Sequence, residues 1–325
     1  RKKQVLQINT PYVSIKIDTI ELDTKDCLMS VVKHNHKYYF LSQEDDYSGS
    51  EGKNYLTVTD SNYNNIYQTI APERYYTLQL QVRNDSIIIK NTFNEIFYYL
   101  NPDSLRWDTI NPSIIPIYED ENFRITSNCS GEFGGTIFFN DKNTNLRYEG
   151  QAICASIINK INNVYYLTNF MPHMTGNSYV IEIPDPKKML QSDTNKNERS
   201  YSDGESISIQ GMNTLFYLDN PIPIASFVHK NRLLHMCSFQ DSITCIAEFR
   251  DNKLRNVLTL NAHIYPKIQQ QVANKYQIYS FFTVNPFEFF DSEQEPDINF
   301  KILFGFIEIT HDEIYIHYIK PTTSK

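Results

Sequence analysis

An all-β fold, a β-propeller with six blades, is predicted by three features of this sequence. Hairpins with the same turn chemistry recur along the chain: an apolar, aromatic-rich strand, a turn led by Asp, Asn or Pro, and a second strand. The first four turns are 40 to 44 residues apart, which is typical of propeller blades. Three of the return strands begin alike, with Leu105-Arg106-Trp107, Leu146-Arg147-Tyr148 and Leu254-Arg255-Asn256. The five turns lie near residues 60, 101, 141, 185 and 251.

The composition agrees with strands joined by tight turns. Tyr (23) and Phe (20) are abundant, and aromatic side chains fit a pleated, half-buried surface. Only 10 Gly are present, so the turns must use Asn and Asp, which tolerate left-handed backbone conformations. No stretch has a convincing helical period.

We predict a single propeller domain over residues 1–325. The stretch Gln191–Gly211 is polar and rich in Ser, Asn and Asp, so we expect a surface loop between the fourth and fifth blades. The alternating stretch Val5–Leu22 is expected to add a strand to the last blade, because closing the ring removes exposed sheet edges. Five or seven blades remain open, since the last two intervals are irregular. The six expected blades span about residues 24–70, 75–110, 115–150, 153–190, 215–260 and 265–320.

The formal charge of −8 argues against a nucleic-acid partner, which requires a basic patch or stripe. No apolar run approaches the roughly 18–20 residues of a membrane helix, so we expect no transmembrane segment. The sequence begins at Arg1 without a Met, so a signal peptide or lipid anchor upstream would not be visible in it.

Three turns carry Asp and Asn at alternate positions, a spacing that resembles the start of a calcium loop. They are Asp60-x-Asn62-x-Asn64, Asp141-x-Asn143-x-Asn145 and, more loosely, Asn101-x-Asp103. The glycine that should follow is missing, and position 12 counted from Asp60 is Ala71 rather than Glu. The same chemistry recurs in register with the blades, which favours hairpin turns over a metal site.

We interpret the histidines and cysteines as structural residues rather than metal ligands. His229, His235, Cys237 and Cys245 lie within 17 residues, but no turn presents ligand pairs at the spacing of a zinc site. We favour a solvated turn for His34 and His36, and edge positions for His311 and His317. No cofactor-binding motif is present either, so we predict neither a metal nor a cofactor.

The cysteines are five in number and widely spread, which does not indicate a disulfide framework. Buried free thiols are the favoured interpretation, although one or two pairs remain possible. The five are Cys27, Cys129, Cys154, Cys237 and Cys245.

The most unusual segment is Cys129–Gly135, which holds three of the ten glycines. Clustered glycines indicate positive φ or a close approach of the backbone to a neighbour or ligand. We expect Glu132 and Phe133 of this turn to approach a polar loop in the next blade that contains Asn169, Phe170 and His173. These five residues are the candidate ligand-binding site, with Glu132 and His173 as candidate acid and base. The simpler alternative is a glycine bulge beside a hydrogen-bonded histidine.

Residues 129–185 resemble a group of uncharacterised bacterial, extracytoplasmic, lipoprotein-type β-propeller proteins. The resemblance rests on Cys-x-Gly-Glu-aromatic-Gly-Gly at 129–135, Ile157-Ile158-Asn159-Lys160 after Cys154, a Tyr-Tyr-x-Thr-Asn strand at 165–169, and His173-Met174-Thr175-Gly176. It implies a location in the periplasm or on the cell surface, with a lipid anchor upstream. It implies no activity.

Three functions follow from these observations. The favoured one is a non-enzymatic binding module for a protein, peptide or glycan, because Tyr and Phe in loops bury a large area at low entropic cost. The first alternative is a carbohydrate-active hydrolase or lyase that uses Glu132 and His173. The second is a structural scaffold subunit. Common nucleophile, phosphate-binding and zinc-protease motifs are absent from the sequence.

Overall fold

The structure is a computed structural model, and the description below is confined to the residues whose placement it defines. These are residues 6–9, 13–25, 27–44, 52–72, 78–83, 86–91, 96–101, 104–110, 116–128, 135–152, 155–171, 177–192, 209–218, 222–238, 244–250, 253–260, 264–266, 277–284, 302–310 and 312–321.

Six β-sheets account for nearly all of the described structure, and the prediction of an all-β, six-bladed β-propeller is confirmed. The described residues include one short 3-10 helix, Pro186–Lys188, and no α-helix. Within them, no helix has the length and apolar character needed to cross a membrane. The chain divides into two compact units, each of which contains three blades, and each unit is described by itself.

Unit 1 consists of residues 1–113, 262–269 and 274–325, and it holds blades 1, 2 and 6. Blade 1 is formed by β3 (Cys27–His34), β4 (Lys37–Gln43), β5 (Asn54–Thr59) and β6 (Asn65–Ile70). Blade 2 is formed by β7 (Leu78–Arg83), β8 (Ser86–Asn91), β9 (Phe97–Leu100) and β10 (Trp107–Ile110). Blade 6 is formed by β24 (Ile264–Pro266), β25 (Gln277–Val284), β26 (Ile302–Ile309) and β27 (Ile314–Pro321), with β2 (Ser14–Leu22) and β1 (Leu6–Asn9) added at its edge.

Unit 2 consists of residues 114–261 and 270–273, and it holds blades 3, 4 and 5. Blade 3 is formed by β11 (Tyr118–Glu119), β12 (Phe123–Ser127), β13 (Thr136–Asp141) and β14 (Arg147–Gln151), with β18 (Leu190–Ser192) at its edge. Blade 4 is formed by β15 (Ala155–Ile161), β16 (Val164–Met171), β17 (Asn177–Ile183) and β19 (Asn213–Leu218). Blade 5 is formed by β20 (Ile222–His229), β21 (Arg232–Ser238), β22 (Thr244–Arg250) and β23 (Lys253–Leu260).

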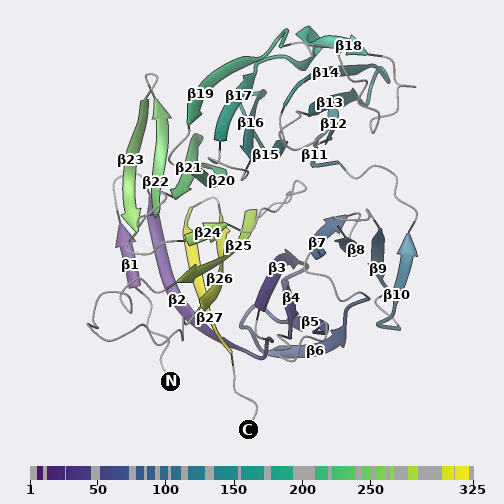
Figure 1. Ribbon diagram of the computed structural model, residues 1–325, viewed down its shortest axis with the longest axis vertical. Helices are drawn as coiled ribbons and strands as arrows, with labels where there is room; N and C mark the ends of the chain where they lie inside the picture. Colours follow the sequence, from purple (N-terminus) through teal and green to yellow (C-terminus); the bar gives the residue numbers. More distant parts are fainter. Residues whose placement is uncertain are drawn as a thin grey trace. The chain divides into compact units, whose positions relative to one another are not determined.

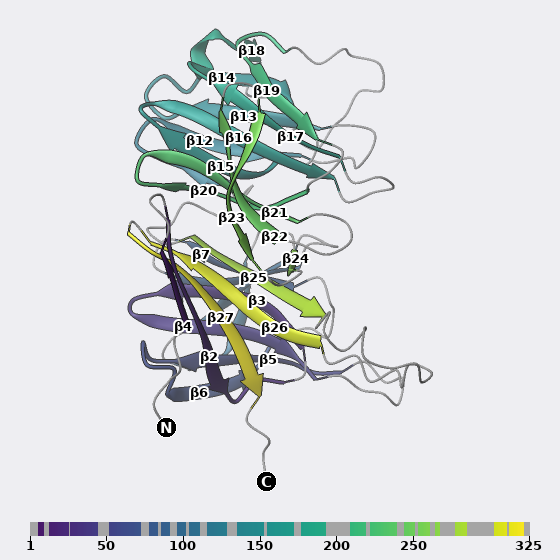
Figure 2. The same ribbon diagram turned by 90° about the vertical axis from the view of Figure 1, so that its left-hand side faces the viewer.

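The N-terminal stretch completes the last blade, as predicted. Strand β2 runs parallel to β27 with Ile15 opposite Ile314 and Leu22 opposite Pro321, and Figure 2 shows the two strands side by side. All other strand pairs of blade 6 are antiparallel. The alternation of apolar and polar residues in β2 explains the pairing, because Ile15 is 0% exposed while the neighbouring Lys16 and Ser14 are half-buried.

Apolar side chains between neighbouring blades form the core of each unit. In unit 1, blades 6 and 1 share a cluster around Phe40 and Phe306, and blades 1 and 2 share another around Leu41 and Ile89. In unit 2, blades 3 and 4 share the largest of these clusters, which includes Phe123, Phe139, Tyr165 and Leu167. The ring of Tyr165 meets those of Phe139 and Phe123 edge-on at 5.3 and 6.0 Å between centroids. Each sheet therefore buries its faces against its neighbours in the unit.

Three of the recurring turns follow one pattern of hydrogen bonds. The side-chain oxygen of Asp60, Asn101 or Asp141 accepts a bond from a backbone N–H two or three residues later, at 2.8, 3.1 and 2.8 Å respectively. A residue in the left-handed region closes each turn, at Tyr63, Leu105 and Asn145 (φ 66°, 53° and 57°). The interpretation of these sequences as hairpin turns is confirmed, since their Asp and Asn oxygens bind the backbone of their own turn.

The predicted hairpin near residue 185 is wrong. Asp185 caps the 3-10 helix Pro186–Lys188 by accepting the backbone N–H of Lys187 at 3.0 Å, and Pro at the first helical position is pre-set for that geometry. The chain then adds β18 to the edge of blade 3, where Tyr148 lies opposite Gln191. Gln191 and Ser192 are therefore strand residues, and the polar stretch after them lies within blade 4 rather than between blades 4 and 5. Residues 193–208 of that stretch lie outside the described residues.

The pairing of β2 with β27 predicts a large difference between two isoleucine variants. Ile15→Ala should lower the free energy of unfolding by about 3 kcal/mol, because Ile15 is 0% exposed and the cavity can collapse only in part. Ile66→Ala is the matched control, since Ile66 of β6 is 47% exposed, and it should lower stability by less than about 1 kcal/mol. Urea unfolding curves of both variants measure the two values. Equal losses would show that β2 is not packed as described.

Candidate functional site

The five residues of the predicted ligand site are only partly within the described structure. Glu132, Phe133 and His173 lie outside the described residues. Asn169 and Phe170 lie near the end of β16, and Phe170 is described by its backbone only. The described part of the site consists of Asn169 and the strands that carry the two loops.

The two loops of the predicted site start from the same end of neighbouring blades. Strands β12 and β16 begin close together, because the Tyr165 hydroxyl donates to Asp120 Oδ2 at 2.6 Å and the rings of Phe123 and Tyr165 are in contact. The far ends of these strands, at Ser127 and Asn169, therefore lie at the opposite end of blades 3 and 4. The segments that follow them contain the glycine-rich turn and His173.

Asn169 carries a buried amide that has no hydrogen-bond partner within the described part of the chain. Its side chain is 0% exposed, and neither its nitrogen nor its oxygen has a partner among the described residues. Strand alternation places it on the face of blade 4 that carries Tyr165 and Leu167, which is the face shared with blade 3. Leaving a buried polar group unpaired costs about 1–3 kcal/mol. An amide at a strand end beside two loops is suited to accept and donate hydrogen bonds to a neutral polar ligand.

Tyr179 lies directly opposite Asn169 on the adjacent strand β17 and packs against the cluster shared by blades 3 and 4. Opposite residues on antiparallel strands have Cβ atoms about 4.5–5.5 Å apart, so the ring and the amide are neighbours. Thr168 and Ser178, also 0% exposed, belong to the same strand ends. This end of blade 4 therefore combines a half-buried aromatic ring with uncharged polar groups.

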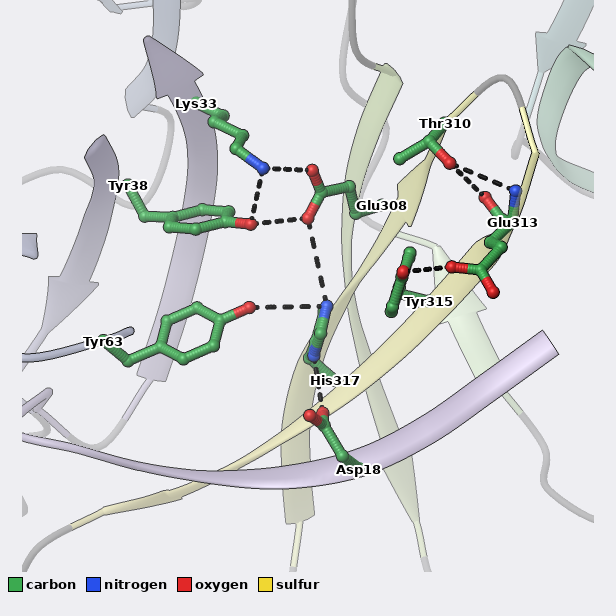
Figure 3. A network of polar contacts seen from close by, with 9 residues as sticks. All are labelled: Asp18, Lys33, Tyr38, Tyr63, Glu308, Thr310, Glu313, Tyr315 and His317. Carbon is green, nitrogen blue, oxygen red and sulfur yellow. Dashed lines mark hydrogen bonds and ion pairs between the residues drawn. The ribbon is translucent and has the colours of Figure 1, made fainter. Parts of the chain in front are cut away.

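A second polar cluster lies in unit 1 between blades 6 and 1, and sequence reasoning did not find it (Figure 3). Lys33 at the end of β3 and Tyr38 at the start of β4 both bind Glu308 of β26. Lys33 Nζ lies 2.6 Å from Glu308 Oε1, the Tyr38 hydroxyl donates to Glu308 Oε2 at 2.6 Å, and Lys33 also donates to the Tyr38 hydroxyl at 2.8 Å. Glu308 is only 5% exposed, so this ion pair is largely withdrawn from water.

His317 of β27 extends the cluster to the N-terminal strand. Its Nδ1 lies 2.5 Å from Asp18 Oδ1 of β2, and because a carboxylate only accepts, Nδ1 carries the proton. Its Nε2 lies 3.4 Å from the Tyr63 hydroxyl and 4.0 Å from Glu308 Oε2. The prediction that His317 occupies an edge position is wrong, since it is 4% exposed. The added strand β2 covers β27 and converts its edge into an interior position.

Tyr63 has a left-handed backbone, an unusual conformation for an aromatic residue, which costs about 1–2 kcal/mol. Packing offsets this cost, because the Tyr63 ring lies 5.0 Å from that of Tyr38 and 5.7 Å from that of His317. Burial, with the charge of Glu308 nearby, raises the pKa of Tyr38 far above its usual value, and burial likewise raises the pKa of Tyr63. Both phenols therefore remain protonated hydrogen-bond donors and are not nucleophiles.

The same arrangement recurs in unit 2 between blades 3 and 4. Lys160 at the end of β15 lies 2.7 Å from Asp120 Oδ2, and Tyr165 at the start of β16 donates to the same oxygen at 2.6 Å. Lys160 and Tyr165 have the spacing of Lys33 and Tyr38, five residues apart across the first hairpin of a blade.

We call each set of three residues an interblade clamp: Lys33, Tyr38 and Glu308 in unit 1, and Lys160, Tyr165 and Asp120 in unit 2. The Lys and Tyr occupy equivalent positions in the two clamps, whereas Glu308 lies in β26 and Asp120 between β11 and β12. The recurrence of the Lys and Tyr pair indicates a structural role for both clamps. The shared spacing was the signal that sequence reasoning missed.

Charged contacts shift the pKa values in the second clamp. Burial raises the pKa of Asp120, but hydrogen bonds from Lys160, Tyr165 and two backbone N–H groups outweigh it and hold the pKa below its usual value. Burial lowers the pKa of Lys160, but its hydrogen bonds to Asp120 and Glu121 outweigh burial. The pKa of Lys160 therefore lies above its usual value. The pair is therefore ionised at neutral pH.

The structure places most of the histidines and cysteines that the sequence analysis considered. His36 is exposed in the turn between β3 and β4, as expected for a solvated turn, while His34 is half-buried. His235 and Cys237 share a face of β21, and His229 and His235 are both 1% exposed. Among the described residues, no group of three or more His, Cys, Asp or Glu side chains is arranged to hold a metal ion. His311 lies outside the described residues.

Comparisons with known proteins add the following findings. No protein-family model and no curated protein matches the sequence. Among solved structures, acylaminoacyl peptidase of Pyrococcus horikoshii is 8% identical with a TM-score of 0.36, covering 87% of this chain and 57% of its own. The β-propeller domain of the Trilobed protease from Pyrococcus furiosus is 6% identical with a TM-score of 0.35, covering 86% of this chain and 92% of its own. A puromycin hydrolase is 7% identical with a TM-score of 0.41, covering 92% of this chain and 50% of its own. Similarities at this level carry no argument about function.

The first clamp predicts strong coupling between Lys33 and Glu308. Lys33→Met and Glu308→Gln should each lower the free energy of unfolding by about 2–4 kcal/mol, because each leaves a buried group without its partner. The double variant should lose at least about 1 kcal/mol less than the two single losses together. Glu21→Gln is the control, since Glu21 and its partner Lys320 are 61% and 63% exposed, and it should change stability by under about 0.5 kcal/mol. Additive losses would argue against the clamp.

The second clamp predicts a pH dependence. The pKa of Asp120 is lower in the folded protein, so its stabilisation is present above the unfolded value of about 3.9 and is lost as the pH falls below it. Asp120→Asn should therefore be less stable than wild type by a constant amount between about pH 5 and pH 8, and the gap should close below pH 4. Urea unfolding at several pH values measures this. Glu121→Gln is the control with a much smaller effect, since Glu121 also binds Lys160 but is 71% exposed. A gap that persists in acid would contradict the assignment.

Proposed function

We propose that the protein is an extracytoplasmic β-propeller binding module that holds a glycan, peptide or protein segment at the loop end of blades 3 and 4. In this proposal Asn169 and Phe170 act with Glu132, Phe133 and His173. The buried amide of Asn169, unpaired among the described residues, is the observation that supports it most directly. Folding alone does not favour such a group, whereas a ligand that binds both amide atoms would compensate for it.

The chemistry of this end of blade 4 supports binding over catalysis. Thr168, Asn169 and Ser178 are uncharged, and an amide neither gives nor takes a proton near neutral pH. A paired donor and acceptor beside the ring of Tyr179 is complementary to sugar hydroxyls or to a peptide backbone. The ligand is therefore proposed to be neutral and polar where it meets Asn169.

The proposed location outside the cytoplasm rests on the resemblance of residues 129–185 to extracytoplasmic lipoprotein-type propellers. Fractionation of cells that express the natural gene, followed by detection of the protein in the membrane and periplasmic fractions, tests it. Recovery in the cytoplasm would overturn the location without bearing on the binding site.

The binding proposal predicts opposite effects of one variant on stability and on binding. Asn169→Leu removes an unpaired polar group and keeps the volume, so the free energy of unfolding should rise by about 1 kcal/mol while ligand binding is lost. Asn213→Ala is the control, because Asn213 is an exposed amide opposite Glu182, at the other end of blade 4. Glycan and peptide arrays identify the ligand, and calorimetry compares the variants. A less stable Asn169→Leu protein that still binds would overturn the proposal.

Catalysis by Glu132 and His173 is a separate outcome of the same experiment. If Glu132→Gln and His173→Ala bind the array ligand as wild type does but fail to turn it over, the protein is a hydrolase or lyase. If no ligand is found on either array, the scaffold interpretation is favoured.

A further inference from the structure

Blade 5 places two of the five cysteines directly opposite each other. Cys237 of β21 is paired with Cys245 of β22 in a regular antiparallel register that continues from Leu234–Glu248 to Ser238–Thr244. Both are free thiols, 1% and 2% exposed, in a small cluster with Ala247 and Leu254. Cys27 lies in unit 1, and Cys129 and Cys154 lie outside the described residues.

The spacing of an antiparallel pair permits a disulfide without moving the strands far. Opposite residues have Cα atoms about 4.5 or 5.5 Å apart, and disulfides form across about 4.4–6.8 Å. The Cβ atoms of opposite residues are about 4.5–5.5 Å apart, whereas a disulfide holds them at about 3.5–4.5 Å. The bond would therefore draw the strands together slightly, and strain of this kind makes a disulfide easier to reduce.

The two sulfur atoms are chemically unequal. The proximity of Cys245 and burial raise the pKa of the Cys237 thiol, whereas the proximity of Cys237 lowers the pKa of Cys245 although burial opposes this. His235 lies on the same face as Cys237, but burial lowers its pKa to about 4, so it is neutral at pH 7 and adds no positive charge. The lowered pKa favours Cys245 as the attacking thiolate, and Cys237, directly opposite on the neighbouring strand, is placed to resolve its oxidised form.

We propose that Cys237 and Cys245 are a redox-active pair that closes reversibly into a cross-strand disulfide when the protein is exposed to a peroxide. The Cys245 thiolate attacks hydrogen peroxide, an S–O bond forms as the O–O bond breaks, and a hydroxide leaves as water after taking a proton. The Cys237 sulfur then attacks the Cys245 sulfur, the S–S bond forms as the S–O bond breaks, and the Cys237 proton leaves with the oxygen as a second water. The two thiols lose two electrons, and one peroxide is reduced to two waters.

The proposal is tested on the full chain by mass spectrometry. Reduced protein is treated with hydrogen peroxide, quenched in acid, unfolded, alkylated with iodoacetamide and digested. A cross-linked peptide pair carrying Cys237 and Cys245, which dithiothreitol converts back to two alkylatable peptides, is the expected result. Cys27→Ser should form the same cross-link. If both cysteines are fully alkylated after a treatment that oxidises Cys27, or if Cys245 is oxidised to sulfinic acid without a cross-link, the proposal is overturned.

A matched pair of variants tests the order of attack. Cys237→Ser leaves Cys245 without its resolving partner, so peroxide followed by dimedone should label Cys245 as a sulfenic acid. Cys245→Ser should leave Cys237 labelled less than Cys245 is in Cys237→Ser, because Cys245 is the thiol proposed to attack the peroxide. Equal labelling of the two variants would overturn the assigned roles. The cross-link in the wild-type chain remains readable whether or not the variants fold.

Discussion

The pairing of β2 with β27 is the contact on which the rest of unit 1 depends. It joins residues almost 300 positions apart in the chain, since Asp18 and His317 are separated by 299 residues. It removes the open edge of β27 and buries Ile15 and Ile20. Because β2 covers the edge of β27, His317 is buried and its ring nitrogens need polar partners within the protein. Asp18 of β2 is one of these partners.

Two largely buried ion pairs lie between blades, and each joins a lysine of one blade to a carboxylate of its neighbour. A buried ion pair adds little to the free energy of folding on average, but removing one partner leaves an uncompensated buried charge, which is costly. The pair therefore strongly disfavours arrangements in which neighbouring blades are misaligned and the two charges no longer meet. The clamps at Lys33 and Lys160 each join the first hairpin of one blade to a carboxylate of its neighbour. We interpret them as devices that set the register between neighbouring blades. In the second clamp Asp120 and Lys160 are ionised and bound to each other, and the raised pKa values of Tyr38 and Tyr165 keep both phenols protonated as hydrogen-bond donors.

Asn169 and the Cys237–Cys245 pair contrast with the clamps, because neither takes part in an ion pair between blades. Asn169 and Cys237 lie near the ends of the second strands of the neighbouring blades 4 and 5 of unit 2, and Cys245 lies at the start of the third strand of blade 5. The amide side chain of Asn159 in β15 donates to the carbonyl of Ser226 in β20 at 2.9 Å and aligns the two blades there. Reactive or unsatisfied groups thus gather where loops leave a rigid sheet, which is where binding residues concentrate in general.

The sequence by itself determined the fold class, because strand periodicity and turn chemistry are local properties. The turns at Asp60, Asn101 and Asp141 are closed by hydrogen bonds from the backbone to a side chain two or three residues away. These turns could therefore be predicted from the local sequence alone. Tertiary structure alone decided the path of Leu190–Ser192 to blade 3, the burial of His317, the two clamps and the meeting of Cys237 with Cys245. Each of these depends on which strand covers which, and no local pattern encodes a partner that lies on another strand or in another blade. Asn169 was found from sequence as a loop-end residue, but only the packing of blades 3 and 4 made it a buried amide.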